Sequence, residues 1–201
     1  MPILKQLQEF IKGKDLTPLW EQFAKEKNGI VKSTSGDLYI EYIFSNFIFK
    51  IANYTHYINS GGKSYEKKYM IGIVEFFHPT QLEICLTKED LFTRVCKLFK
   101  NQEITIGYKD FDNKFYVKSN KEQKAISLLK DKNIIEKIIT LNPTRIEITN
   151  KDGLFGETPS NGKYMLYYAK QERLENLNQF YQIDLLLETF IKNLKEKYEI
   201  K

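Results

Sequence analysis

Cysteine and histidine are scarce in this chain of 201 residues, which contains two of each. Cys85 and Cys96 lack the close spacing of paired metal ligands, so we expect buried free thiols. Histidine is the commonest general base and transition-metal ligand. His56 and His78 fall far apart on two predicted strands, which argues against a shared metal or a catalytic pair. We therefore predict no metal, no cofactor and no catalytic residue.

Long apolar runs are also absent. The longest are Tyr42–Phe44, Phe47–Phe49 and Leu185–Leu187, and polar residues interrupt them well before the ~20 residues that cross a bilayer. Residues 1–9 carry Gln, Glu and Lys every few positions, unlike the continuous apolar segment of a secretory signal. We expect a cytoplasmic protein with no membrane helix.

Arginine is rare, although the formal net charge is +5. The chain contains only Arg94, Arg145 and Arg173, whereas planar bidentate recognition of phosphate favours arginine. Many Lys, Ile and Asn residues beside only four alanines indicate a bias toward AT-rich codons, which raises the lysine content without a binding role. The net charge alone therefore does not predict a nucleic-acid partner.

Motifs of catalysis and nucleotide binding are missing as well. Gly61-Gly62-Lys63-Ser64 resembles the end of a phosphate-binding loop, but that motif requires a strand-to-helix context and a further glycine where this chain has Tyr57. The sequence thus favours a protein that is not an enzyme, and an enzyme of unidentified class stays an alternative. Its acid or base groups would be Glu75, Asp110, Asp112, His56 or His78.

Aromatic residues, in contrast, are plentiful: 14 Phe and 13 Tyr in a chain that is 42% hydrophobic can fill one sizeable core. We predict a single α+β domain over residues 1–201, with a mainly antiparallel sheet, a long central hairpin, N-terminal helices and a long C-terminal helix packed on the sheet. The helices are expected at 2–12, 17–28, 90–100, 119–129, 131–141 and 174–198. The strands outside the hairpin are expected at 37–44, 82–86, 104–107, 115–118, 144–149 and 163–169.

The central hairpin is predicted from two long alternating segments, 46–58 and 65–78, on either side of Gly61-Gly62. With the two glycines at the tip, one face of the hairpin is apolar in both strands and the other is mixed, so both alternations agree on a single register. The apolar face would pair Phe47 with Phe76, Phe49 with Val74, Ile51 with Gly72 and Asn53 with Met70. The mixed face would pair Lys50 with Ile73, Tyr54 with Tyr69 and His56 with Lys67.

The segment from Phe111 to Glu122 reads Phe-Asp-Asn-Lys-Phe-Tyr-Val-Lys-Ser-Asn-Lys-Glu. We expect Phe111 and Phe115 to be buried in the core on either side of a tight turn. The side chain of Asp112 should hydrogen-bond the backbone of this turn, and Ser119 should cap the next helix. With the downstream helix, the segment resembles a signature of uncharacterised bacterial families of unknown function, in which a Phe-Asp/Glu-x-x-Phe-x-Val strand precedes a polar turn and a helix. The resemblance covers about a fifth of the chain. It implies an α+β bacterial domain and supplies no catalytic residue.

The favoured function is a non-catalytic binding or protein-interaction module for a protein segment or a small molecule. It is based on the absence of catalytic motifs and on the long loop from Asn150 to Gly162, because long loops are often functional. Within this loop, the apolar pair Leu154-Phe155 is hard to bury locally.

A polyanion or single-stranded nucleic-acid binder is the alternative. Lysines interleaved with tyrosines on one hairpin face can neutralise phosphate and stack bases. The residues concerned are Lys50, Lys63, Lys67 and Lys68 with Tyr54, Tyr65 and Tyr69. The apolar character of both faces of Met70–Phe77 suggests that something packs on each side, and a homodimer is one way to provide it.

Overall fold

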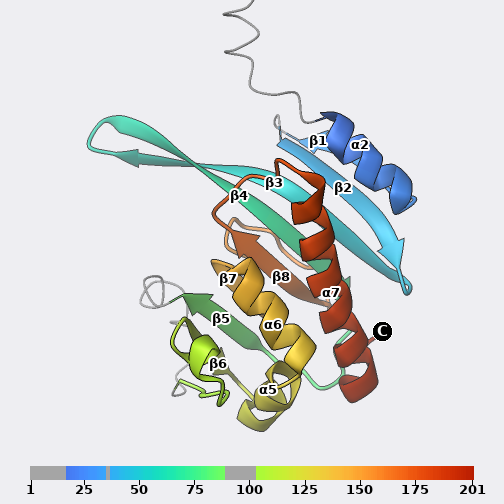
Figure 1. Cartoon of the computed structure of the whole chain (residues 1–201), viewed down its shortest axis with the longest axis vertical. Coiled ribbons are helices and arrows are strands. Elements are labelled where there is room, and N and C mark those ends of the chain that lie inside the picture. Colours follow the sequence, from blue (N-terminus) through green and yellow to red (C-terminus); the bar gives the residue numbers. More distant parts are fainter. Residues whose placement is uncertain (1–16, 35–36, 89–102) are drawn as a thin grey trace, which may run out of the picture.

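In the computed structural model, residues 17–34, 37–88 and 103–201 are described, and they form one eight-stranded sheet with five helices (Figure 1). The strand order is β1-β2-β3-β4-β8-β7-β5-β6, and all neighbouring strands are antiparallel. The strands are β1 Ile30–Thr34, β2 Asp37–Phe44, β3 Phe47–Ser60, β4 Lys63–Phe76, β5 Ile84–Lys88, β6 Phe115–Ser119, β7 Arg145–Thr149 and β8 Tyr164–Lys170. The helices are α2 Thr17–Glu26, α4 Lys109–Asp112, α5 Glu122–Leu129, α6 Lys132–Leu141 and α7 Leu177–Tyr198.

The predicted architecture is confirmed: the fold is α+β, with an antiparallel sheet, a long hairpin and a long C-terminal helix. The helices predicted at 2–12 and 90–100, and Cys96 with them, lie outside the described residues. Strand β1 was not predicted, because its sequence Ile-Val-Lys-Ser-Thr is short and does not alternate.

The hairpin of β3 and β4 has the predicted register. Phe49 lies opposite Val74, Tyr54 opposite Tyr69, and His56 opposite Lys67. Gly61 and Gly62 form the tip with φ angles of 58° and 75°. Two successive residues with positive φ are what a tight two-residue hairpin turn requires, and glycine adopts them without a steric penalty.

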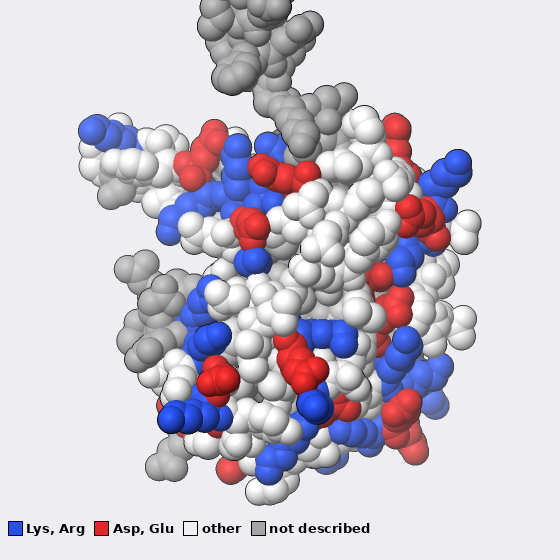
Figure 2. Space-filling view, in the orientation of Figure 1, with Lys and Arg blue, Asp and Glu red and all other residues white. Residues whose placement is uncertain are grey.

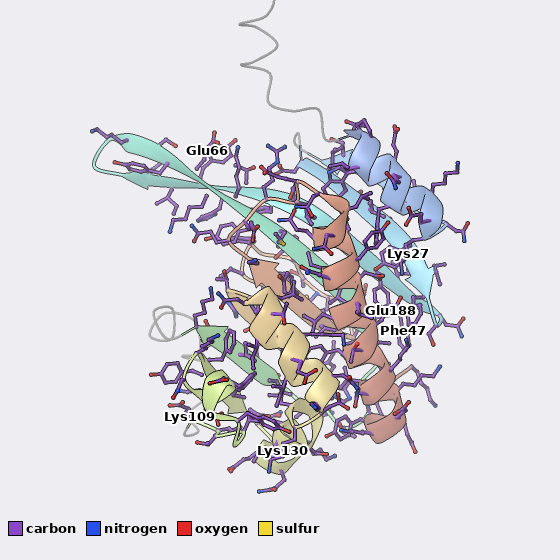
Figure 3. The ribbon with its side chains drawn as sticks, in the orientation of Figure 1. Lys27, Phe47, Glu66, Lys109, Lys130 and Glu188 are labelled. Atoms are coloured by element: carbon purple, nitrogen blue, oxygen red, sulfur yellow. The ribbon has the colours of Figure 1, made fainter. Side chains whose placement is uncertain are left out.

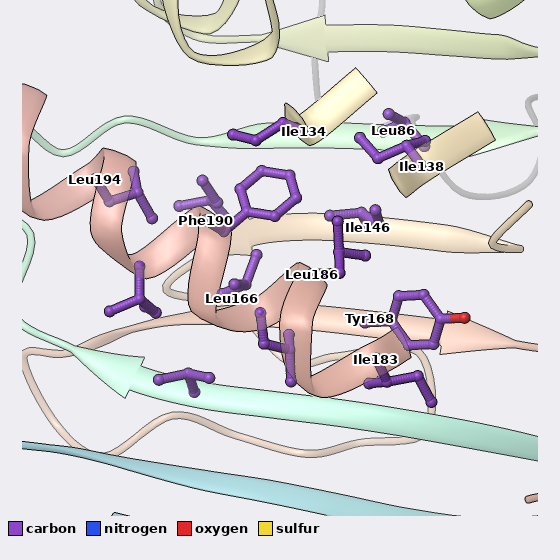
Figure 4. Close-up of a cluster of buried hydrophobic side chains, with 14 of the residues drawn as sticks. Leu86, Ile134, Ile138, Ile146, Leu166, Tyr168, Ile183, Leu186, Phe190 and Leu194 are labelled. Atoms are coloured by element: carbon purple, nitrogen blue, oxygen red, sulfur yellow. The ribbon is translucent and has the colours of Figure 1, made fainter. Parts of the chain in front are cut away.

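All five described helices contribute to one hydrophobic core on a single face of the sheet. Figure 4 shows this face, where side chains of α6 and α7 meet those of the strands. The labelled residues are Ile134 and Ile138 of α6, Ile183, Leu186, Phe190 and Leu194 of α7, and Leu86, Ile146, Leu166 and Tyr168 of the sheet. The opposite face, which we call the open face, has a smaller cluster composed of strand residues and the loop after β7.

Side-chain caps occur at the start of two described helices, α6 and α7. Asp131 accepts a hydrogen bond from the backbone N–H of Ile134, as predicted, and Asn176 forms a capping box with Gln179 at the start of α7. The predicted cap by Ser119 is wrong, because α5 begins after Lys121 without a side-chain cap. Ser119 is the last residue of β6, and its hydroxyl donates to the carbonyl of Glu83.

Around Phe111 the structure differs from the prediction in two respects. The predicted turn is a helical turn, α4, and residues 104–107 do not form a strand. The carboxylate of Asp112 accepts hydrogen bonds from the N–H groups of Ile106 and Gly107, so these groups are not available to a neighbouring strand. Phe111 and Phe115 are both buried, with ring centroids 5.4 Å apart, which confirms them as core anchors.

The outer part of the hairpin extends beyond the rest of the sheet (Figure 1). Pairing of β2 with β3 stops at Ala52, and pairing of β8 with β4 stops at Met70. Residues 55–68, which we call the arm, are therefore a two-stranded ribbon within the described part of the chain.

Candidate ligand-binding groove

The loop between β7 and β8 folds back over the open face of the sheet. The N–H of Gly153 donates to the carbonyl of Glu157 over 2.7 Å, and the hydroxyl of Ser160 donates to the Glu75 carboxylate over 2.7 Å. Gly153 lies so close to Tyr167 that a Cβ atom would come within 3.0 Å of its ring. Because any larger residue would push the loop away from the sheet, glycine is needed at this position.

The loop brings together the two surfaces that the sequence analysis treated separately. The ring of Phe155 stacks on Tyr54, with centroids 4.2 Å apart, and also contacts Tyr69 and His56 at 4.7 and 5.4 Å. Leu154 and Phe155 are half-buried against the strands. The apolar pair thus packs on the hairpin face that was expected to stack bases, and burial there raises the pKa of Tyr69.

Beside this aromatic cluster, two neighbouring hollows share Lys50 and Glu157, and we call them together the groove. The first hollow, of about 680 Å³, is lined by Tyr39, Tyr54 and Phe155 as well as the shared pair. The ammonium group of Lys50 lies 4.4 Å from the centroid of the Tyr39 ring. The volume is within the range of pockets that bind ligands.

The second hollow, of about 660 Å³, continues along the open face toward the β2–β3 turn. Ile73 and Met165 line it together with Glu75. Its wall includes Ile48, which is 59% exposed and lies opposite Ile43, which is 71% exposed. The groove therefore runs from an aromatic cluster to the exposed Ile48, and Lys50 and Glu157 lie where its two hollows meet.

A buried ion pair lies further along the open face, on β7. Arg145 and Glu147 form a salt bridge, and Tyr167 of β8 lies directly opposite Glu147. Burial raises the pKa of Glu147, and the nearby Arg145 opposes this shift. Arg145 Nε, Glu147 Oε2 and the Tyr167 hydroxyl have no hydrogen-bond partner among the described residues.

Of the remaining residues from the sequence analysis, Lys63, Tyr65 and Lys67 do not line the groove, whereas Lys68 lines its first hollow. Lys67 is exposed on the arm, opposite His56. Lys68 is on the other face of the arm, opposite Thr55. The expectation that Lys67 and Lys68 share one surface is therefore wrong. Glu157 and Tyr39 line the groove but were not predicted, since a single carboxylate in a loop or a tyrosine in a short strand has no distinguishing pattern.

The two histidines have different surroundings. His56 contacts Tyr54 and Phe155, whereas His78 is buried against Phe76, Tyr164 and Tyr198. Burial lowers the pKa of His78 to about 4, and the charges of two nearby lysines act in the same direction. No group of three metal-ligating side chains occurs in residues 17–34, 37–88 and 103–201.

The buried His78 predicts a specific pH dependence of stability. Its folded-state pKa is below the value of about 6.5 in an unfolded chain, so its contribution to stability is complete above pH 6.5 and declines as the pH falls toward 4. The decline is at most about 1.4 kcal/mol per pH unit. Urea unfolding of His78→Leu across this interval should show a flatter dependence than the wild type, and parallel curves would contradict the prediction.

Comparison of the chain with protein-family models, with curated proteins and with solved structures found no match. The resemblance of the Phe111–Glu122 segment to bacterial families of unknown function therefore stays a prediction. Among the helices of residues 17–34, 37–88 and 103–201, none is long and apolar enough to cross a membrane.

Proposed function

We propose that this chain is a non-catalytic binding module that holds an extended segment of a partner protein in the groove. The observation that carries the proposal is that none of the described helices packs on the open face, where the groove joins an aromatic cluster to the exposed Ile48. Exposed apolar surface next to a concave site is typical of protein-interaction surfaces.

The shape of the groove favours an extended peptide over a compact small molecule. Its two hollows follow one another along β3, the first beside residues 50–57 and the second beside residues 46–50, and they share only Lys50 and Glu157. A chain lying along both could place an apolar side chain against Ile48 and an aromatic one against Phe155. Its backbone or charged groups would then meet the ammonium of Lys50 and the carboxylate of Glu157 midway.

The carboxylates of the groove support binding over acid–base catalysis. Glu41 pairs with Lys32, and Glu75 accepts a hydrogen bond from Ser160 and lies 3.9 Å from Lys163. Glu157 accepts a hydrogen bond from the N–H of Phe155. These three carboxylates, out of five that line the groove with Asp37 and Glu66, already have hydrogen-bond or ion-pair partners, which suits recognition better than proton transfer.

Selection from a displayed library of random peptides of about 12 residues, the scale of known groove-bound segments, tests the proposal. Peptides enriched on the wild type should bind it in solution, as measured by fluorescence anisotropy. Lys50→Glu should weaken binding about tenfold or more, because the loss of one charged contact commonly amounts to about 1.4 kcal/mol or more. Phe155→Ala should weaken it similarly by opening the aromatic end.

The matched control is Lys130→Glu, which makes the same charge change at an exposed residue after α5, on the helix side of the sheet (Figure 3). It should leave peptide affinity within about twofold, since distant surface changes have small effects. Failure to enrich any peptide, or an equal loss in Lys130→Glu and Lys50→Glu, would overturn the proposal.

A further inference from the structure

Several side chains of the arm, residues 55–68, do not line the groove. Residues 63–68 of β4 are all exposed, and neither edge of the ribbon beyond Thr55 and Lys68 pairs with another described strand. Isolated two-stranded ribbons are only marginally stable in water, so a projecting ribbon of this length is typical of an element that contacts a partner.

The register assigns the residues of the arm to two chemically different faces. Lys63, Tyr65 and Lys67 alternate along β4 and therefore lie on one face, the continuation of the open face. Glu66 and Lys68 lie on the opposite face, where Glu66 pairs with Tyr57. The first face thus has two lysines and no carboxylate. The second face has one lysine and one glutamate, so its formal charges sum to zero.

The two lysines on the first face of the arm are not neutralised by described residues. Lys63 and Lys67 form no ion pair with any of them. On the face seen in Figure 2, positive and negative side chains are interspersed over the body of the molecule, which gives no continuous cationic track there. The arm therefore offers uncompensated positive charge beside an aromatic ring, Tyr65, which is 52% exposed.

We propose that the arm binds single-stranded nucleic acid through Lys63, Tyr65 and Lys67. Alternate residues of a strand are about 6.6 Å apart, so a base stacked on Tyr65 would have its flanking phosphates within reach of the two flexible lysine side chains. Stacking on an exposed aromatic ring with neutralisation of the adjacent backbone is the general mode of sequence-tolerant single-strand binding.

The geometry places this site on the arm and not on the hairpin face predicted from the sequence. Tyr54 and Tyr69 are covered by Phe155, so neither ring offers a free stacking surface. No ring of the described residues covers Tyr65, which is 52% exposed. The proposal is independent of the peptide groove, since it uses none of the residues tested there.

Fluorescence anisotropy with a labelled oligo(dT) of about 20 nucleotides, longer than the usual site of one binding domain, tests the inference. The wild type should bind at about 50 mM salt and lose affinity toward about 200 mM. Tyr65→Ala should weaken binding about fivefold or more, the lower limit for the loss of one stacked base. Lys63→Ala with Lys67→Ala should reduce the slope of log affinity against log salt by about 1.4.

Tyr57→Ala is the matched control, because Tyr57 is 61% exposed on the opposite face of the same ribbon. It should leave affinity within about twofold, as expected for a surface change outside the contact. Thermal unfolding of each variant checks that the fold is retained. Absence of binding at low salt, equal effects of Tyr65→Ala and Tyr57→Ala, or tighter binding of a duplex of the same length would each overturn the proposal.

Discussion

Replacement of Phe180 by alanine is expected to destabilise the protein by about 3–5 kcal/mol, the usual range for a buried phenylalanine. Phe180 is fully buried near the start of α7. Its ring packs edge-on against Trp20 with centroids 4.7 Å apart and stacks on Phe23 at 5.0 Å. Truncation therefore removes two of the aromatic contacts between α2 and α7, as well as leaving a cavity.

Leu185→Ala is the control for this prediction, because Leu185 lies on the same helix and is 51% exposed. Its cost should be within about 1 kcal/mol, since most of its surface is already in water. Urea unfolding followed by circular dichroism and by the fluorescence of the single Trp20 measures both variants. Similar costs for Phe180→Ala and Leu185→Ala would show that α2 and α7 do not depend on this contact.

The hairpin could be predicted in detail because two independent patterns agree on it. Alternation in β3 and in β4 each fixes a buried face, and the glycine doublet fixes the turn, so a shift of one residue would expose Phe49 and Val74 together. The helix caps show the limit of local patterns. Asp131 caps its helix, whereas Ser119, with an equally good motif, is held in β6 by its pairing with Ile84.

The groove could not be predicted, because it depends on contacts between distant parts of the chain. The sequence indicated Leu154-Phe155 and the tyrosines of the hairpin as separate surfaces, and only the fold of the loop shows that Phe155 lies on Tyr54. The hydrophobic effect predicts that an apolar residue will be buried, but it does not predict which surface of the protein will cover it. Tyr39 and Glu157 become visible only when the strands and the loop are in place.

A buried polar network between α2, β2 and α7 could not be predicted from the apolar periodicity of α7. Asp184 and Glu188 interrupt the apolar stripe of α7, yet both are buried. Lys27 forms salt bridges with both carboxylates, and Figure 3 labels it together with Glu188. The hydroxyl of Tyr42 donates to Asp184 over 2.6 Å. Two acidic residues four positions apart on an apolar stripe indicate that a cationic partner is present. They do not indicate which residue that partner is.

Substitution of Lys27 by methionine is expected to cost about 3 kcal/mol or more at neutral pH, because it leaves two buried carboxylates without their shared cation. Burial already raises the pKa of Asp184, and Lys27 and Tyr42 oppose the shift. Without Lys27 the pKa of Asp184 should rise further above its value in the unfolded chain. The folded variant then takes up a proton before the unfolded chain does, so its deficit relative to the wild type should shrink as the pH falls.

Lys192→Met provides the control, because Lys192 pairs with Glu188 at 3.3 Å but its side chain is 58% exposed. Exposed pairs contribute about 1 kcal/mol or less, so this variant should be only slightly destabilised. Urea unfolding at about pH 7 and about pH 5 distinguishes the two lysines, since protonation of Asp184 should recover more stability where Lys27 is absent. An equal cost for both variants, or a deficit of Lys27→Met that does not change with pH, would mean that the carboxylates at this interface are stabilised by water and not by Lys27.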